Sequence, residues 1–230
     1  MPYQLKSGLT VADADGVAKN NVSAFWTQTW WRILFDASEQ DVVNKVASRT
    51  PQNLLAQRLV RRHQAVVDTT TGDIVGYARW ILSEEHAGNW LEAQTPAVSD
   101  AERTRFKEVF DDAQLPFGEN QDDMDALDDP VHEKQDELEP KTPYLKLDYL
   151  ATHPDHQKRG ISTMLVESGL EQADKLGIET VVTAMGTIST HLYKKLGFEM
   201  RWDLEQSLKP WGHDDVYYTA ILTRKPVKGN

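Results

Sequence analysis

Strand-like and helix-like patterns alternate along the second half of the chain. Tyr144–Thr152 and Glu179–Ala184 are short runs rich in apolar and β-branched residues, which predicts two strands. Between them, apolar residues recur at helical spacing over Gly160–Leu176, and Gly177 follows at the position of a helix-terminating glycine. Three more elements are predicted beyond them: a short helix over Thr187–Leu196 and strands over Phe198–Asp203 and Val216–Thr223. This order predicts an α/β or α+β layer with at least one parallel strand pair.

The first half is predicted to hold several helices and one hairpin. The aromatic-rich segment Val11–Phe35 reads as one or two helices, and a further helix is predicted across Pro51–Arg62. Gln64–Asp68 and Ile74–Trp80 are two β-branched runs separated by a turn that contains Gly-Asp. That combination is typical of a β-hairpin.

Residues 83–142 form a long segment with little pattern, apart from a helix predicted over Asp100–Ala113. Such an insertion in a compact domain is usually a functional lid or a disordered excursion. Ten acidic residues and one lysine lie between Glu119 and Glu139, whereas the rest of the chain is close to neutral. The segment is therefore either a flexible, solvated surface loop, which its composition favours, or an acidic flap that concentrates cationic amines near a cleft.

Length and composition indicate an ordinary globular protein, with residues 1–230 as one domain. The chain has no cysteine, which excludes disulfides and an acyl-cysteine intermediate. It shows neither a signal-peptide pattern nor an apolar run long enough to cross a membrane, so we expect a cytoplasmic protein. A net charge of −11 argues against nucleic-acid binding. No residues stand at metal-ligand spacing, so no metal site is expected.

A possible phosphate site lies where the strand at Tyr144–Thr152 gives way to the following helix. The first N–H groups of a helix have no partner within it and lie at the positive end of its dipole, which suits an anion. Gly160 allows close approach of the backbone, Ser162 is small, and Lys158 and Arg159 add positive charge. An ordinary capped helix after a turn remains the alternative for this motif taken alone.

Two stretches of the chain resemble the two signature motifs of the GNAT superfamily of acetyltransferases, and they occur in the order and at the spacing found in that superfamily. Leu150-Ala-Thr-His-Pro-Asp-His-Gln-Lys-Arg-Gly-Ile-Ser162 resembles the acetyl-CoA loop of that superfamily, and Leu192-Tyr-Lys-Lys-Leu-Gly-Phe198 resembles its second signature. The long insertion before the loop is similar to that of puromycin-type and related fungal small-molecule acetyltransferases. The resemblance implies a GNAT-like, mixed and mostly antiparallel sheet with a splayed parallel strand pair, flanked by helices.

The resemblance also implies roles for individual residues in binding acetyl-CoA. Main-chain groups of Leu150, Ala151 and Thr152 would bind the pantetheine arm along the splayed strand. Tyr193 would protonate the departing thiolate, a task that suits a phenol because it is neutral at pH 7. The residues that would hold the pyrophosphate are Gln157, Lys158, Arg159, Gly160, Ile161 and Ser162. Taken alone, Tyr193 would read as a packing residue.

One carboxylate is a candidate for the catalytic base, and three tryptophans are candidates for the acceptor pocket. Asp148 is expected by alternation on the same face as Lys146 and Leu150. It is a candidate base for the incoming ammonium, and a carboxylate paired with a lysine is the alternative. Trp26, Trp30 and Trp31 are either a helix–helix seam or an aromatic acceptor pocket.

Two positions depart from the family pattern. Ser162 stands where the loop motif has Gly or Ala, which is a mild change because its hydroxyl is small. Gly186 stands seven residues before Tyr193, where many members have asparagine, so one hydrogen bond near the acetyl group would be missing.

The predicted activity is direct transfer of an acetyl group from acetyl-CoA to a primary amine of a small molecule, within a ternary complex. The predicted enzyme is a monomer or homodimer. Two alternatives stay open: a catalytically silent acyl-CoA-binding module and a protein N-acetyltransferase.

Overall fold

The fold is built on one seven-stranded sheet in a computed structural model that describes residues 2–119, 122, 125 and 127–227. The strand order is β1-β2-β3-β4-β5-β7-β6, and β4–β5 is the parallel pair while the other neighbours are antiparallel. The strands are β1 (Tyr3–Ser7), β2 (Arg61–Asp68), β3 (Ile74–Leu82), β4 (Tyr144–Thr152), β5 (Glu179–Met185), β6 (Glu199–Ser207) and β7 (Val216–Arg224). The predicted mixed, mostly antiparallel sheet is confirmed.

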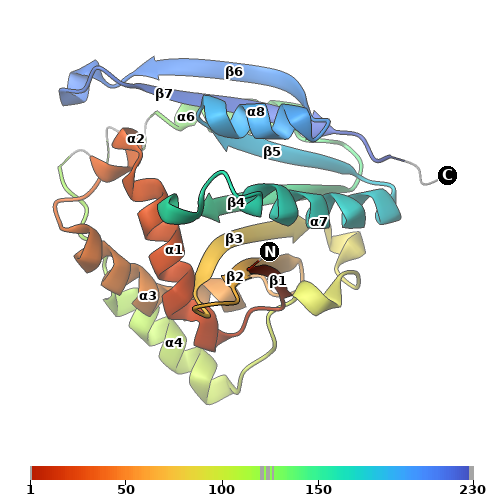
Figure 1. The fold of residues 1–230 in the computed structure, drawn as a ribbon, viewed down its shortest axis with the longest axis horizontal. Helices are drawn as coiled ribbons and strands as arrows, with labels where there is room; N and C mark the ends of the chain where they lie inside the picture. The colour runs from red at the N-terminus through yellow and green to blue at the C-terminus, as the bar shows by residue number, and fades with distance from the viewer. Residues whose placement is uncertain (1, 120–121, 123–124, 126, 228–230) are drawn as a thin grey trace.

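Helices cover both faces of the sheet (Figure 1). The helices are α1 (Ala14–Trp26), α2 (Thr29–Arg32), α3 (Glu39–Leu55), α4 (Asp100–Asp112), α6 (Asp129–Leu138), α7 (Ile161–Leu176) and α8 (Thr187–Lys195). Helix α1 packs on β3, β4 and α3, whereas α7 packs on the opposite face of β3 and β4. No helix of the described residues is both long and apolar enough to span a bilayer.

The C-terminal half follows the predicted elements within a few residues. Helix α7 ends at Gly177, which has a left-handed backbone with φ of 68°. The hairpin of β2 and β3 and the helix α4 are also confirmed. The predicted segment Val11–Phe35 contains two α-helices, α1 and α2.

Two predictions for the first half are wrong or incomplete. The predicted helix across Pro51–Arg62 instead spans Glu39–Leu55, because Ser38 caps its first turn and Pro51 lies inside its last turns rather than at its start. Arg61 and Arg62 belong to β2. Strand β1 carries no strong pattern and was not predicted; it forms because β2 offers it a pairing edge.

The insertion at 83–142 is partly helical. Its acidic part contains α6, which buries Val131, and the prediction of a solvated loop therefore does not describe residues 129–138. The part of that prediction that falls on residues 120, 121, 123, 124 and 126 lies outside the described residues.

Two glycines let α7 lie unusually close to the sheet. A Cβ on Gly169 would lie 2.1 Å from the Trp80 ring, and a Cβ on Gly76 would lie 2.4 Å from Ile161 Cγ2. Trp80 is fully buried, so its ring has no free space to move into. The close contact fixes the position of α7, and with it the helix N-terminus, relative to β3 and β4.

Gly169→Ala tests this contact. Alanine favours a helix by up to about 1 kcal/mol over glycine, but overpacking a core costs about 1–3 kcal/mol. We expect a net loss of about 1–2 kcal/mol in the free energy of unfolding, measured by chemical denaturation. Gly88→Ala is the matched control, because Gly88 is exposed and a Cβ there meets nothing within 4 Å. Equal stability of the two variants would contradict the packing argument.

Candidate functional site

Strands β4 and β5 pair only over their first halves. The register joins Tyr144–Leu147 to Glu179–Val182, and beyond that point β4 stays on β3 while β5 stays on β7 (Figure 1). In the described part of the chain, the facing edges of the two strands have no strand partner after Leu147 and Val182. Their backbone N–H and C=O groups are therefore available to an extended ligand.

A β-bulge lies at the point where the strands part. Arg79 pairs with Tyr149 and Trp80 with Leu147, so Asp148 is the extra residue on β4. The bulge turns Asp148 toward Arg79, whose Nε donates to Asp148 Oδ2 at 2.5 Å. The alternative of an ion pair is thus realised, although with an arginine in place of a lysine.

The bulge also corrects the predicted face of Asp148. Leu150 packs into the cluster beneath α7, whereas Tyr149 packs into the cluster beneath α1, with Arg79 close to its ring. Asp148 lies on the Tyr149 side and not on the Leu150 side, because the extra residue breaks the strict alternation of a strand.

The loop between β4 and α7 has the backbone of an anion site. Lys158 and Gly160 both have left-handed backbones, with φ of 59° and 83°, and no side chain caps α7. Residues Gln157 to Gly160 are exposed, and the first N–H groups of α7 that follow them have no partner within the helix. The Thr152 and Ser162 hydroxyls lie 2.8 Å apart and join the end of β4 to the start of α7.

Strand β1 contacts this loop through side-chain hydrogen bonds. The sequence analysis did not predict these contacts. The Tyr3 hydroxyl lies 3.1 Å from His156 Nδ1 and accepts a hydrogen bond from Arg159 Nη1 at 2.9 Å. From α1, Asn20 Oδ1 accepts from the His153 backbone N–H at 3.0 Å. His153 and His156 are thus half-buried parts of the turn rather than free surface residues.

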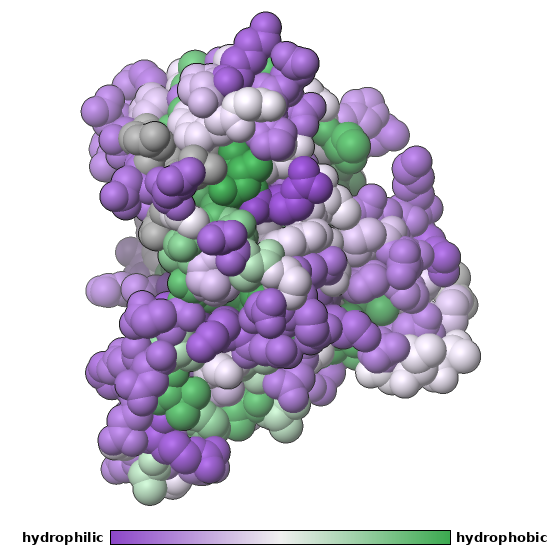
Figure 2. All heavy atoms as spheres, turned by 90° about the vertical axis from the view of Figure 1, so that its left-hand side faces the viewer, coloured by the Kyte–Doolittle hydropathy of each residue, from purple (hydrophilic) through white to green (hydrophobic). Residues whose placement is uncertain are grey.

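A cavity of about 340 Å³ occupies the opening between the two strands. Most of its lining is apolar or aromatic, and of its lining residues in the described part of the chain two are carboxylates and none is cationic. They are Phe25, Trp30, Trp31, Leu34, Asp128, Leu147, Asp148, Tyr149, Leu150, Val182, Thr183, Met185, Ser189 and Tyr193. Figure 2 views the side of the molecule toward which α1 and α2 lie, and apolar surface shows there between polar side chains.

Tyr193 projects from α8 into the wall of this cavity and is only 3% exposed. Its ring makes an edge contact with Phe198, with centroids 5.5 Å apart. Burial raises the pKa of the Tyr193 phenol above its ordinary value, so the group stays protonated at neutral pH.

Two of the three tryptophans line the cavity, and the third packs in an aromatic seam beside it. Trp30 and Trp31 line the cavity. Trp26 does not; it packs against Trp31 and Phe35 with ring centroids 6.0 and 6.2 Å away. Trp26 is the last residue of α1 and belongs to this aromatic seam, outside the lining of the cavity.

His63 on β2 pairs with Arg79, the partner of Asp148, but its side chain is buried. It is 1% exposed, and its Nδ1 lies 2.9 Å from the Tyr77 hydroxyl. Burial, followed by the nearby charges of Arg79 and Arg61, lowers the pKa of His63 to about 3. His63 is therefore neutral and out of reach of a ligand.

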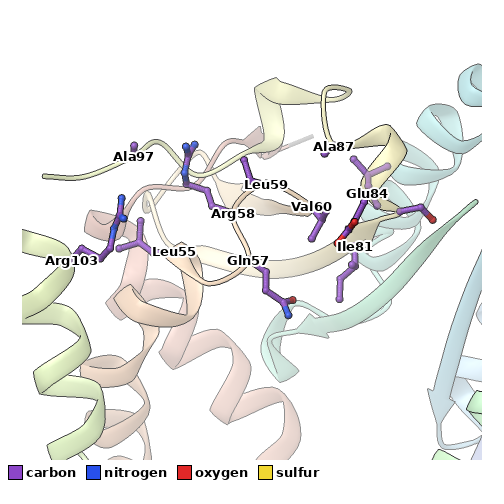
Figure 3. Close-up of a pocket in the computed structure, with 12 residues that line it drawn as sticks. Leu55, Gln57, Arg58, Leu59, Val60, Ile81, Glu84, Ala87, Ala97 and Arg103 are labelled. Carbon is purple, nitrogen blue, oxygen red and sulfur yellow. The ribbon is translucent and has the colours of Figure 1, made fainter. Parts of the chain in front are cut away.

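A larger cavity of about 910 Å³ lies at the C-terminal end of β3, where Ile81 and Leu82 line it. Figure 3 shows Arg58 and Arg103 on one side of it and Glu84 on the other, with Val60 and Ile81 between. Its lining includes no residue of β4, β5 or α8. The two cavities therefore share no lining residue among those that the structure describes.

Sequence reasoning missed several residues of the smaller cavity. Asp128 comes from the acidic insertion, and Phe25 and Tyr149 come from predicted elements, but nothing in their local pattern pointed to a pocket. The acidic run alone gave a general signal, which did not single out Asp128.

Comparisons with known proteins agree with this geometry. Residues 125–198 match the model of the acetyltransferase (GNAT) family. Among solved structures, a Corynebacterium glutamicum protein described as histone acetyltransferase HPA2 and related acetyltransferase is 16% identical, with 100% of this chain and 99% of that chain covered and a TM-score of 0.59.

Two insect enzymes are also similar. Drosophila melanogaster polyamine N-acetyltransferase, described as forming N-acetylagmatine, is 13% identical over 97% of this chain and 99% of that chain, with a TM-score of 0.56. Aedes aegypti arylalkylamine N-acetyltransferase 2 is 13% identical over 98% of this chain and 99% of that chain, with a TM-score of 0.56. At these identities the likeness shows the fold, which is the GNAT acetyltransferase fold.

Proposed function

We propose that this chain, which has the GNAT fold, is an N-acetyltransferase that transfers the acetyl group of acetyl-CoA to a primary amine of a small molecule. The observation that carries the proposal is that the edge of β4 without a strand partner and the Tyr193 phenol line one cavity. The loop that leads to the open N-terminus of α7 begins at the end of the same strand. These are the parts that binding and cleaving a thioester of coenzyme A require.

The residues present fit coenzyme A. The backbone of Leu150 to Thr152 offers a free edge for the amide groups of the pantetheine arm. Further along, the left-handed pair Lys158 and Gly160 and the first amides of α7 form a cradle for the pyrophosphate. When bound, acetyl-CoA supplies the activated acetyl group, and every other group needed for transfer belongs to the chain.

Two side chains would move protons. Tyr193, held neutral by burial, donates its proton to the sulfur as the thiolate leaves. Asp148, at the bulge, accepts the proton that the ammonium must lose before it attacks; only its Oδ2 is bonded to Arg79. With no cysteine in the chain, the acetyl group passes directly from thioester to amine within a ternary complex.

The shape of the cavity favours a small acceptor over a protein. A volume of about 340 Å³ holds a compact molecule, and Trp30 and Trp31 close one side of it. A protein chain would need a long open groove instead. The similarity to enzymes described as polyamine and arylalkylamine N-acetyltransferases agrees with an amine of this size.

Gly160→Ala tests the loop. Alanine at φ of 83° is strained, and we expect coenzyme A affinity to fall by about tenfold or more, as for a lost hydrogen bond to a charged group. The measurement is the calorimetric Kd for coenzyme A. Gly72→Ala is a matched control, since Gly72 has φ of 81° in the β2–β3 turn and equally open surroundings. Both variants should lose about 1 kcal/mol of stability, but an affinity loss shared by both would refute the assignment.

Tyr193→Phe tests the acid. We expect kcat to fall by about 10²–10⁴-fold with little change in the KM for acetyl-CoA, because the hydroxyl acts on the departing sulfur. Steady-state release of free thiol measures both constants. Tyr144→Phe serves as the control, since its hydroxyl donates to Glu139 far along β4 from the opening. Unchanged turnover in the Tyr193 variant removes the residue from the mechanism.

Asp148→Asn tests the base. At neutral pH, kcat/KM should fall by about 10²-fold or more, and it should recover as pH rises and the free amine becomes deprotonated in solution. The pH–rate profile is the measurement. Asp174→Asn, which breaks a comparable carboxylate–arginine pair with Arg224 away from the cavity, should lower stability without changing that profile. A low rate that does not recover with pH would mean that Asp148 only positions Arg79.

A further inference from the structure

The acidic insertion returns to the cavity and is anchored there. The Tyr217 hydroxyl on β7 donates to Asp128 Oδ1 at 2.6 Å, and Gln206 Nε2 on β6 donates to the Leu127 carbonyl at 2.9 Å. On α6, Gln135 Nε2 donates to Thr183 Oγ1 on β5 at 2.7 Å. Residues 127–138 therefore form a wall of the site and not a free flap.

The Asp128 side chain does not cap the helix that it precedes. Asp128 occupies the N-cap position of α6, where an aspartate commonly accepts from the first backbone amides, but its side chain makes no such bond. Among the described residues, its carboxylate forms no ion pair with a lysine, arginine or histidine. One oxygen is bonded to Tyr217, and the carboxylate lines the cavity.

The two carboxylates of the cavity lie at different depths. Asp148 lies beside Leu147 and Val182, the last paired residues of β4 and β5, where the opening begins. Val182 pairs with Leu222 of β7, and Tyr217 lies five residues further toward the open end, about 16 Å along a strand. Asp128 therefore marks the outer part of the cavity and Asp148 its inner end.

The wall between these two ends is aromatic. The Trp30 ring lies 5.1 Å from the Tyr217 ring, next to Asp128, and 5.9 Å from the Phe25 ring. Phe25 in turn lies 5.3 Å from Tyr149, next to Asp148. An apolar or aromatic body packs well on such a wall, and aromatic faces also attract cations.

We propose that Asp128 binds a second positive charge on the acceptor, so that the preferred substrate is a diamine with an apolar or aromatic body. The reacting amine lies at the inner end beside Asp148, and the distal ammonium bonds to Asp128 at the outer end. This inference rests on the proposed function and specifies its substrate class.

A matched pair of acceptors tests the inference. 1,4-Bis(aminomethyl)benzene and 4-methylbenzylamine share the ring and one amine and differ in the second ammonium. With coenzyme A present, calorimetry should show that the diamine binds about tenfold to hundredfold more tightly than the monoamine, beyond the factor of two for its equivalent amines. Asp128→Asn should abolish that preference, and Tyr217→Phe should reduce it.

Asp129→Asn is the control for general electrostatics, because it removes the same charge from the exposed neighbouring residue, which does not line the cavity. Its diamine preference should match that of the unmodified chain. A preference that survives Asp128→Asn, that falls equally in Asp129→Asn, or that is absent from the unmodified chain overturns the inference.

Thiol release with the same two amines separates this inference from the proposed function. Binding that depends on Asp128 without any acetyl transfer would support the diamine site and count against the acetyltransferase. Acetyl transfer to both amines at equal kcat/KM, with equal affinity, would support the acetyltransferase and overturn the diamine site.

Discussion

The site exists because β4 and β5 are each held by a different neighbour. Antiparallel pairing keeps β4 on β3 and β5 on β7, and the parallel pair between them ends at Leu147 and Val182. Two strands that part in the middle of a sheet leave backbone polar groups without partners, which is costly unless water or a ligand bonds to them. The bulge at Asp148 lies at that point, and the cavity fills the space beyond it.

Helix α7 brings the second half of the site to this edge. Its closeness to β3 depends on Gly169 beneath the Trp80 ring and on Gly76 beneath Ile161. Because Ile161 is the first residue of α7, the same contact that packs the core also sets the distance between the helix N-terminus and β4. A substitution that shifts α7 in the core would therefore also shift its N-terminus relative to β4.

Features with a local cause could be predicted from the sequence. Helical periodicity and Gly177 defined α7, and the close backbone approach that glycine permits pointed to Gly160. Features created by distant pairing could not. Strand β1 needs the edge of β2, the bulge needs the register of β3 against β4, and Asp128 acquires its place from Tyr217, 89 residues away. No local pattern records such contacts, because each depends on where another element lies.

The position of a charge matters more for this cavity than the net charge of −11. Exposed carboxylates on α6 are screened within about 8–10 Å at physiological ionic strength, so they steer a cation without distinguishing one amine from another. Inside the cavity Asp148 is already paired with Arg79, which leaves Asp128 as the carboxylate of the lining without a cationic partner among the described residues. A partly enclosed carboxylate with aromatic neighbours favours a guest that brings the missing positive charge, because pairing offsets the cost of its desolvation. If the chain acts as proposed, selectivity for the acceptor would therefore follow from one anchored side chain of the insertion rather than from the acidity of the whole segment.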